Sequence, residues 1–395
     1  MRIANGYPLI AEVGELYNLS FGFGRCRLSR ASRNIIAALG VYASVACAAS
    51  AVTLRSVEDQ MMRWILRLVS IVTVMLIWST AGNAAQTEPS ASSPKSGTRL
   101  ITLGTRGGPI PMVGRAQSSN ALIVNGTPYI VDAGEGVTRR LTRAGIAIRD
   151  INTIFITHPH SDHTGGLGGL LSADYDFPHT KPVTVLGPPG TAASVKGLVD
   201  FLTVSSDIRI SDGTHTVPAF KIFSGRDTGT GVIYQDANVK VSAVENTHFH
   251  FPPGSPAYGK YKSYSYRFET SDRVVIFSGD TGPSEALTEL AKGADLLVTE
   301  ITYLSAEEAK AQQIRTGQWA QRTPEEQASY LRHNEEEHLR PEEVGKMAAR
   351  AGVKTVVLTH LPASGDPNDS YERFAADVNK NFTGRVLVAR DLMEF

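Results

Sequence analysis

Short apolar runs alternate with amphipathic segments from residue 99 to the C-terminus. Three early runs, at 101–103, 121–124 and 129–131, predict strands, because they are apolar and bounded by turn-forming residues. Asn125-Gly126 between the second and the third predicts a hairpin turn. Further strands are predicted at 153–156, 183–186, 239–244, 264–269, 274–277, 296–299, 355–358 and 386–389, and helices at 137–144, 191–202, 283–291 and 341–351. Hairpins followed by alternating strands and helices indicate a layered α/β architecture.

The first 85 residues differ from the rest in composition, with eight arginines, four acidic residues and no lysine. Within them, Arg63 and Arg67 precede an eleven-residue apolar run at 68–78, and a small-x-small cleavage site follows at 82–84. This layout is typical of a secretory signal peptide, and the run is short for a transmembrane helix. We therefore predict a signal peptide or membrane anchor over 61–85, a polar linker over 86–98 and a catalytic domain over 99–395.

The position of this segment leaves two interpretations of residues 1–60, because a signal peptide normally starts a chain. In the first, translation begins at Met61 or Met62 and residues 1–60 are not translated. In the second, the chain begins at Met1 and residues 35–54 form a first, weakly hydrophobic membrane segment. Both interpretations predict that the chain after about residue 85 is exported, to the periplasm or out of the cell.

The balance of charge argues against one class of partner. The chain has 39 basic and 39 acidic residues, whereas nucleic-acid-binding proteins usually carry an excess of Lys and Arg. Removal of residues 1–85, with their eight basic and four acidic residues, leaves 31 basic and 35 acidic residues. The chain has only two cysteines, both in the removed segment, and this small number excludes a disulfide-rich scaffold and a cysteine-ligated zinc finger. We therefore expect a small-molecule ester as the substrate and no nucleic-acid partner.

A cluster of potential metal ligands directly follows the predicted strand at 153–156. It contains His158, His160, Asp162 and His163, and imidazole and carboxylate are ligand types that suit zinc and similar divalent ions. Alternation in an extended loop directs the first two to one side, and the last two begin a helix and face another way. One ion cannot take all four ligands, so the spacing predicts two neighbouring metal ions.

This HxHxDH segment resembles the metallo-β-lactamase superfamily, and the resemblance extends over residues 99–395. Further matches are an Asp that ends an earlier strand, a Gly-Asp after a strand and two histidines that follow later strands. These residues are Asp132, Asp280, His248 and His360, with His250 as a rival to His248. The resemblance implies an α/β fold, the four-layer αββα sandwich, with two zinc ions. It implies that His158, His160 and His248 bind the first ion, that Asp162, His163 and His360 bind the second, and that Asp280 bridges them.

The segments at 103–105, 132–136 and 358–360 resemble the ribonuclease Z branch of that family. His338 stands where that branch carries a further catalytic histidine. The chain also departs from ribonuclease Z: the loop after the first strand has no lysine, and no basic arm for tRNA is evident. The segment 305–337, which we expect to be helical and exposed, has near-balanced charge. These departures favour the exported hydrolases of the branch, which are arylsulfatase-like and phosphodiesterase-like.

We therefore expect an exported dinuclear zinc hydrolase that cleaves phosphodiester or aryl sulfate esters through a metal-bridging hydroxide. Asp162 is expected to orient the hydroxide, His338 to protonate the leaving group and Asp132 to support a ligand histidine. The alternatives are a ribonuclease Z-type 3′-tRNA processing endonuclease, or a lactonase or β-lactamase. A non-catalytic binding protein is disfavoured because no ligand is missing. Among other residues, His179, His215 and His333 are interpreted as surface residues, Tyr258 and Tyr261 as candidate lining of the site, and Trp319 and Tyr330 as a lid or a homodimer contact.

Overall fold

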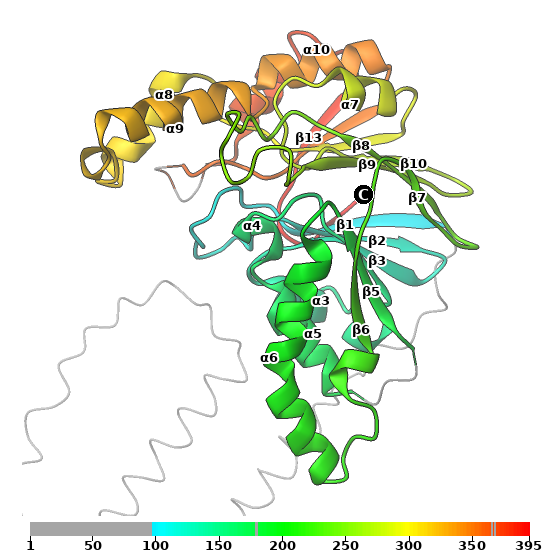
Figure 1. Cartoon of the computed structure of the whole chain (residues 1–395). Coiled ribbons are helices and arrows are strands. Elements are labelled where there is room, and N and C mark those ends of the chain that lie inside the picture. Colours follow the sequence, from blue (N-terminus) through cyan, green and yellow to red (C-terminus); the bar gives the residue numbers. More distant parts are fainter. Residues whose placement is uncertain (1–96, 178–180, 365, 367–368) are drawn as a thin grey trace, which may run out of the picture. The chain divides into compact units, whose positions relative to one another are not determined.

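The computed structural model describes residues 97–177, 181–364, 366 and 369–395. The predictions for residues 1–60 and 61–85, and for most of the linker, lie outside these residues and stay predictions. Within the described part of the chain, no helix is long and apolar enough to cross a membrane. Two seven-stranded sheets dominate this part, and they lie face to face (Figure 1).

The first sheet has the strand order β14-β1-β2-β3-β4-β5-β6. Its strands are β1 (Thr98–Gly104), β2 (Ser119–Val124), β3 (Thr127–Ala133), β4 (Thr153–Phe155), β5 (Val183–Gly187), β6 (Phe223–Asp227) and β14 (Met393–Glu394). Strands β2 and β3 form the predicted hairpin, in which Asn125 has a φ of 50° and Gly126 a φ of 85°. From β3 to β6 the strands are parallel, so their carboxyl ends meet at one edge of the sheet.

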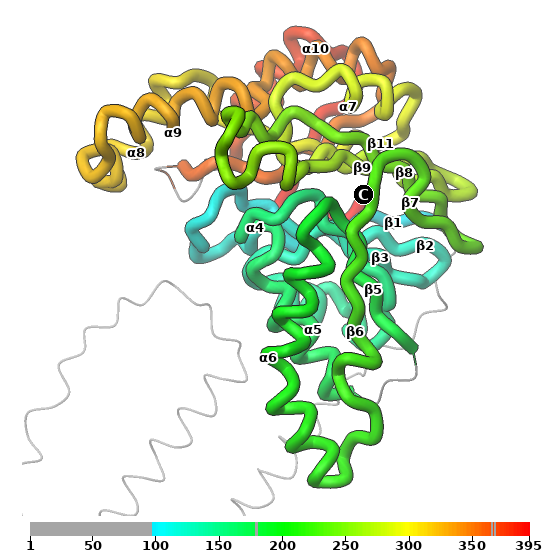
Figure 2. The backbone as a smooth tube through the Cα atoms, in the orientation of Figure 1, coloured from blue at the N-terminus to red at the C-terminus, as the bar shows by residue number. Residues whose placement is uncertain are grey.

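The second sheet has the strand order β13-β12-β11-β10-β9-β8-β7. Its strands are β7 (Gly231–Gln235), β8 (Lys240–Glu245), β9 (Tyr264–Glu269), β10 (Val274–Phe277), β11 (Leu296–Thr299), β12 (Thr355–Leu358) and β13 (Arg385–Val388). Strands β10 to β13 are parallel. Figure 2 shows the chain passing from the first half to the second, and the C-terminal strand β14 then returns to the first sheet.

Helices cover the outer face of each sheet. The longer ones are α3 (Val137–Arg143), α5 (Leu167–Tyr175), α6 (Thr191–Ser211), α8 (Ala306–Arg315), α9 (Pro324–Glu336), α10 (Pro341–Ala351) and α11 (Glu372–Val378). The shorter ones are α4 (Ser161–Thr164), α7 (Glu285–Leu290) and the 3₁₀ turns η1 (Ile148–Asp150), η2 (Ala219–Lys221) and η3 (Trp319–Gln321).

Three buried apolar clusters hold these layers together. One lies between the two sheets and includes Leu100 and Phe155 from the first and Phe268 and Val298 from the second. A second packs α3, α5 and α6 on the first sheet, and a third packs α7, α10 and α11 on the second. Burial of apolar surface on both faces of each sheet is the main stabilising contribution. The predicted four-layer αββα sandwich is therefore confirmed.

The largest differences from the predicted elements lie at the sheet edges and in the insert before α10. Strands β6, β7 and β14 and helices α5 and α11 were not predicted, and α6 continues nine residues beyond the predicted helix end, to Ser211. The segment 305–337 forms two helices, α8 and α9, which lie side by side in Figure 1. This pair (called the α8–α9 hairpin below) is not exposed all round, because Ala309, Gln312 and Asn334 are buried.

Candidate metal centre and adjoining pocket

Three histidine nitrogens converge at the carboxyl edge of the two sheets. His158 and His160 follow β4, and His248 follows β8. The Nδ1 atom of His160 lies 3.1 Å from Nε2 of His158 and 3.1 Å from Nε2 of His248. Burial lowers the pKa of His158 and of His248 well below the usual 6.5, so both rings are neutral and keep a lone pair for a cation.

A second cluster lies beside the first and combines two carboxylates with two imidazoles. Asp162 and His163 belong to α4, Asp280 follows β10 and His360 follows β12. Nε2 of His360 lies 3.2 Å from Oδ2 of Asp162 and 3.1 Å from Oδ2 of Asp280. Burial alone lowers the pKa of His360, but the two carboxylates outweigh it and raise this pKa to about 10. The cluster therefore strongly favours positive charge.

Asp280 is the residue that touches both clusters. Its Oδ2 atom lies 3.8 Å from Nε2 of His158 and 4.0 Å from Nε2 of His248 in the first cluster. Its Oδ1 atom lies 3.2 Å from Nε2 of His163 in the second. The carboxylate is almost fully buried, at 2% exposure. This position suits the bridging role that the sequence predicts for it.

The donor atoms fit divalent metal ions. His163 Nε2 and Asp280 Oδ1 are buried and lie 3.2 Å from each other, but neither makes a well-aligned hydrogen bond with a described residue. Buried polar atoms without partners are costly unless a ligand satisfies them. The nitrogen–nitrogen spacing of 3.1 Å in the first cluster is close to the edge of about 3.3 Å of a zinc tetrahedron with metal–nitrogen distances of about 2.0–2.1 Å. Both clusters could therefore hold a metal ion.

Groups behind the clusters fix the orientation of the ligands. The Nδ1 atom of His163 lies 2.8 Å from Oδ2 of Asp132, and Nδ1 of His248 lies 2.9 Å from the carbonyl oxygen of Glu337. Such contacts select the ring tautomer that turns Nε2 to a metal. Asp132 also accepts a hydrogen bond from the Thr157 backbone N–H at 2.8 Å. Asp132 and His360 both have a positive φ, 63° and 48°, a strained backbone conformation that is common at functional sites.

His338 lies beside the clusters in the loop between α9 and α10, and it is 9% exposed. Its Nδ1 atom lies 2.6 Å from Oε2 of Glu300, a buried acid that the sequence analysis missed. Burial lowers the pKa of His338 to about 3, so the ring is neutral. The sequence did offer one signal for Glu300, because it directly follows the buried strand β11, just as Asp280 follows the neighbouring strand β10.

One other histidine differs from its predicted place, and the rival to His248 lies outside the clusters. His333 is half-buried rather than on the surface, and its Nε2 atom lies 3.0 Å from Nε2 of His338. Its Nδ1 atom lies 2.8 Å from Oε2 of Glu337. The sequence could not show this, because the contact depends on the path of the α8–α9 hairpin. His250, the rival to His248, is exposed and belongs to neither cluster, and its Nδ1 atom lies 3.8 Å from Oε2 of Glu336.

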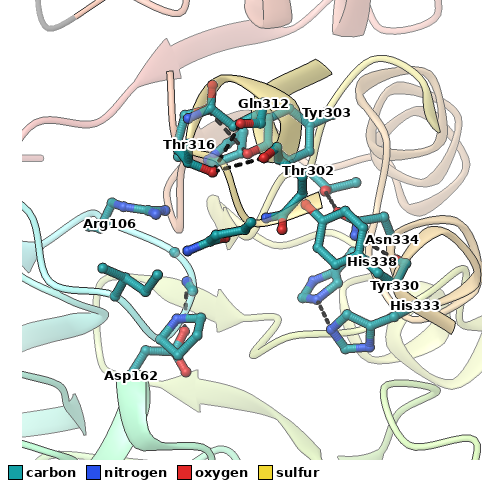
Figure 3. Close-up of a pocket in the computed structure, with 18 of the residues that line it drawn as sticks. Arg106, Asp162, Thr302, Tyr303, Gln312, Thr316, Tyr330, His333, Asn334 and His338 are labelled. Atoms are coloured by element: carbon teal, nitrogen blue, oxygen red, sulfur yellow. Dashed lines mark hydrogen bonds between the residues drawn. The ribbon is translucent and has the colours of Figure 1, made fainter. Parts of the chain in front are cut away.

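A pocket of about 960 Å³ opens beside the clusters. Figure 3 shows Arg106 and Asp162 on one side, His338 and His333 on the other, and Gln312 and Thr316 of α8 at the top of the view. Tyr330 lines this pocket, whereas Tyr258 and Tyr261 are not among its described lining residues. The α8–α9 hairpin is thus one wall of the pocket.

Comparisons with known proteins agree with this geometry. A family model described as "Beta-lactamase superfamily domain" matches residues 127–361. Ribonuclease Z from Mycolicibacterium paratuberculosis is 30% identical over 298 residues, which cover 74% of this chain and 96% of that protein.

Two solved structures share the fold at low sequence identity. The metallo-β-lactamase fold protein YhfI from Bacillus subtilis aligns with a TM-score of 0.54 at 17% identity, covering 76% of this chain and 99% of that one. Zn²⁺-bound PqqB from Methylobacterium extorquens aligns with a TM-score of 0.53 at 17% identity, covering 75% of this chain and 99% of that one.

These relatives correct one prediction. The expectation of a small-molecule ester and no nucleic-acid partner is wrong, because the chain matches almost the whole length of proteins named as ribonucleases. That expectation rested on net charge, which averages over the whole surface and is blind to the charges that face one pocket. The expectation of a metal-dependent hydrolase is confirmed by the same family matches. The chain belongs to the metallo-β-lactamase superfamily and, within it, to the ribonuclease Z branch.

Proposed function

We propose that this protein is a ribonuclease Z-type endonuclease that cleaves a phosphodiester bond of RNA, in the 3′ processing of tRNA precursors. The observation that carries the proposal is the 30% identity with ribonuclease Z over 96% of that protein's length. The His338–Glu300 pair beside the two ligand clusters supports it, because phosphodiester hydrolysis needs a proton donor for the leaving oxygen.

We assign the metal ligands as the sequence predicts them. His158, His160 and His248 would hold one ion, Asp162, His163 and His360 the other, and Asp280 would contact both. Two divalent ions, which we expect to be zinc, would supply an activated water at neutral pH and neutralise charge on the phosphate. Asp132 would act behind His163, and Glu337 behind His248, by fixing the ring orientation.

The chain's own residues have separate tasks in this proposal. Asp162 accepts a hydrogen bond from the Gly108 N–H at 2.8 Å and is the carboxylate proposed to orient the attacking water. His338 is held by Glu300 through Nδ1, so its Nε2 atom is the one available to the substrate. As the bond between phosphorus and the leaving oxygen breaks, that oxygen takes the proton from Nε2 of the neutral His338, and Glu300, whose pKa burial raises well above its usual value, gives its own proton to Nδ1. His333, 3.0 Å from Nε2 of His338, is placed to resupply the proton.

The test is a hydrolysis panel with the full chain and added zinc. It compares a 3′-extended tRNA precursor, bis(p-nitrophenyl) phosphate, an aryl sulfate and a β-lactam. We expect cleavage of the precursor and, more slowly, of bis(p-nitrophenyl) phosphate, and loss of both in Asp280→Ala. Hydrolysis of only the aryl sulfate or only the β-lactam would overturn the proposal.

A further inference from the structure

The guanidinium of Arg106 is buried in the wall of the pocket without an acidic partner. The residue is 7% exposed, and its described contacts are neutral: Nε donates to Sδ of Met112 at 2.9 Å and Nη1 to the carbonyl of Leu361 at 3.1 Å. No carboxylate lies within ion-pair distance among the described residues. A buried cation without a counter-charge is unfavourable, so this position favours a ligand that brings an anion.

Two further arginines line the same pocket from the α8–α9 hairpin, and they also have neutral neighbours. Arg315 donates twice to Oε1 of Gln312, at 3.0 and 2.6 Å. Arg322 lies over the ring of Tyr330 at 5.0 Å and contacts Oε1 of Gln313 at 3.4 Å. Neither forms an ion pair with a described residue.

The acidic side chains of the hairpin do not cancel this charge. Glu307, Glu325, Glu326, Glu335 and Glu336 are exposed and are not among the described lining residues. Among the described residues, the acids that line the pocket are Asp162 and Asp280, which belong to the ligand clusters. The charge of this segment therefore separates in part, because Arg315 and Arg322 line the pocket whereas these five glutamates are exposed outside it.

Arg106 lies directly beside the metal centre. Two residues later, the Gly108 N–H donates to Asp162, and between them Gly107 is so close to His360 that a Cβ there would lie 2.4 Å from Nδ1. An anion bound by Arg106 is thus adjacent to a group held at the clusters. A pocket of about 960 Å³ lies at the upper end of the range of about 300–1,000 Å³ that is typical of small-molecule sites. It has room for more than one phosphate group.

We propose that Arg106, with Arg315 and Arg322 on the α8–α9 wall, binds the phosphate that neighbours the scissile phosphodiester. The preferred substrate is therefore an oligonucleotide with at least two successive phosphates, and not a simple diester. A guanidinium offers two parallel N–H donors, which match two oxygens of one phosphate. This inference rests on the proposed function, because it takes the bond cleaved at the clusters to be a phosphodiester.

The first experiment compares substrates with one and with several phosphates, using the full chain with zinc. Arg106→Gln should raise KM for a short single-stranded RNA about 10- to 100-fold, the loss expected for a charge-assisted contact. It should change kcat/KM for bis(p-nitrophenyl) phosphate by less than about threefold. An equal loss on both substrates would assign Arg106 to the support of the metal loop, and no loss on either would exclude the subsite.

Arg106 also donates a hydrogen bond to the carbonyl of Leu361, so its substitution could disturb the loop itself. A second variant is therefore made at an arginine that has no such structural contact. Arg315 is an exposed residue at the end of α8. The variant Arg315→Gln should raise KM for the RNA, as Arg106→Gln does, and should leave kcat unchanged. The matched control is Arg332→Gln, which removes the same charge from α9 outside the described pocket lining. Equal increases of KM in Arg315→Gln and Arg332→Gln would show that only the net charge of the hairpin matters, and would overturn the assignment.

A third arm separates failure of the inference from failure of the proposed function. If the chain hydrolyses bis(p-nitrophenyl) phosphate but no RNA, the proposed function has failed. The subsite is then tested by comparing the inhibition constants of thymidine 3′,5′-bisphosphate and thymidine 5′-monophosphate in that reaction. We expect the bisphosphate to bind about tenfold more tightly in the wild type and to lose this advantage in Arg106→Gln. An advantage that persists in the variant would refute the subsite.

Discussion

The backbone N–H of Gly108 donates a hydrogen bond to Oδ2 of Asp162 at 2.8 Å, which ties the loop after β1 to the metal centre. Gly107 makes this approach possible, since a Cβ at that position would lie 2.4 Å from Nδ1 and 2.5 Å from the carbonyl oxygen of His360. Gly107→Ala should therefore displace His360 and weaken metal binding at the second cluster at least about tenfold. Metal analysis after dialysis measures the loss.

The control for that variant is Gly197→Ala. Gly197 lies inside α6, and a Cβ there meets no atom within 4 Å. Alanine is a better helix former than glycine, so this change should leave metal content intact and keep or slightly raise stability. Equal metal content in both variants would show that the loop tolerates the extra atom and does not support His360.

His338 and Glu300 form a pair that should act on turnover and not on metal binding. His338→Ala should lower kcat by about 10²- to 10⁴-fold while the protein keeps its metal, because general acid catalysis contributes about that much. Glu300→Gln should lower kcat less and change the pH profile of kcat, because it alters the group that holds Nδ1 of His338 at 2.6 Å. Loss of metal in His338→Ala would instead make this histidine a ligand.

Asp280 should be required for metal and for activity together, because its carboxylate reaches both clusters. Asp280→Ala should abolish hydrolysis and reduce metal content, as measured by elemental analysis. A variant that still binds two ions per chain would show that the bridging assignment is wrong. Asp207→Ala, a change at an exposed position on α6, is the matched control and should leave both quantities unchanged.

Asp236 directly follows β7 of the second sheet and contacts β3 of the first, and its contribution to stability should depend on pH. Its Oδ2 atom accepts hydrogen bonds from Tyr129 at 2.6 Å and from Tyr234 at 2.9 Å. Burial acts to raise the pKa of Asp236, but hydrogen bonds from Tyr129 and from the backbone hold it below the usual 3.8. Asp236→Ala should therefore lower the free energy of unfolding by about 1 kcal/mol at neutral pH. This value is small because Asp236 is exposed and water weakens its interactions.

The sign of the pH effect follows from the lowered pKa. The stabilisation is complete above the unfolded value of 3.8 and is lost as the pH falls through the lower native value. The gap between the urea midpoints of the wild type and Asp236→Ala should thus be constant from pH 5 to 7 and close below about pH 4. A gap that widens on acidification would contradict this account.

The sequence predicted the central strands well because they are short apolar runs buried on both faces. Strands β6, β7 and β14 were missed, and each lies at an edge of its sheet, where a strand is exposed on one side. In β6 only Phe223 is buried, and in β7 no residue is. Such strands owe their structure to the neighbour with which they pair, which a local pattern does not reveal.

The metal ligands could be found in the sequence because each follows a strand within a recognisable segment. Glu300 also follows a strand, but no recognisable segment marks it, and the roles of Glu300 and His333 appear only from their contacts with His338. The arginine-lined pocket was also hidden, because Arg106 and Arg315 line the same pocket only through the path of the α8–α9 hairpin. Side chains that contact each other across a fold leave no local pattern in the sequence. The overall composition therefore led to the wrong prediction about a nucleic-acid partner.

The candidate ligands are divided between the two sheets: His158 to His163 follow β4 in the first, whereas His248, Asp280 and His360 follow strands of the second. Neither half of the chain can therefore build the centre before the sheets have closed on each other. Recovery of activity on refolding would report the docking of the two halves rather than the formation of either one. Metal ions held there would act as a reversible cross-link between the halves, and the melting temperature should rise with the free metal concentration by mass action.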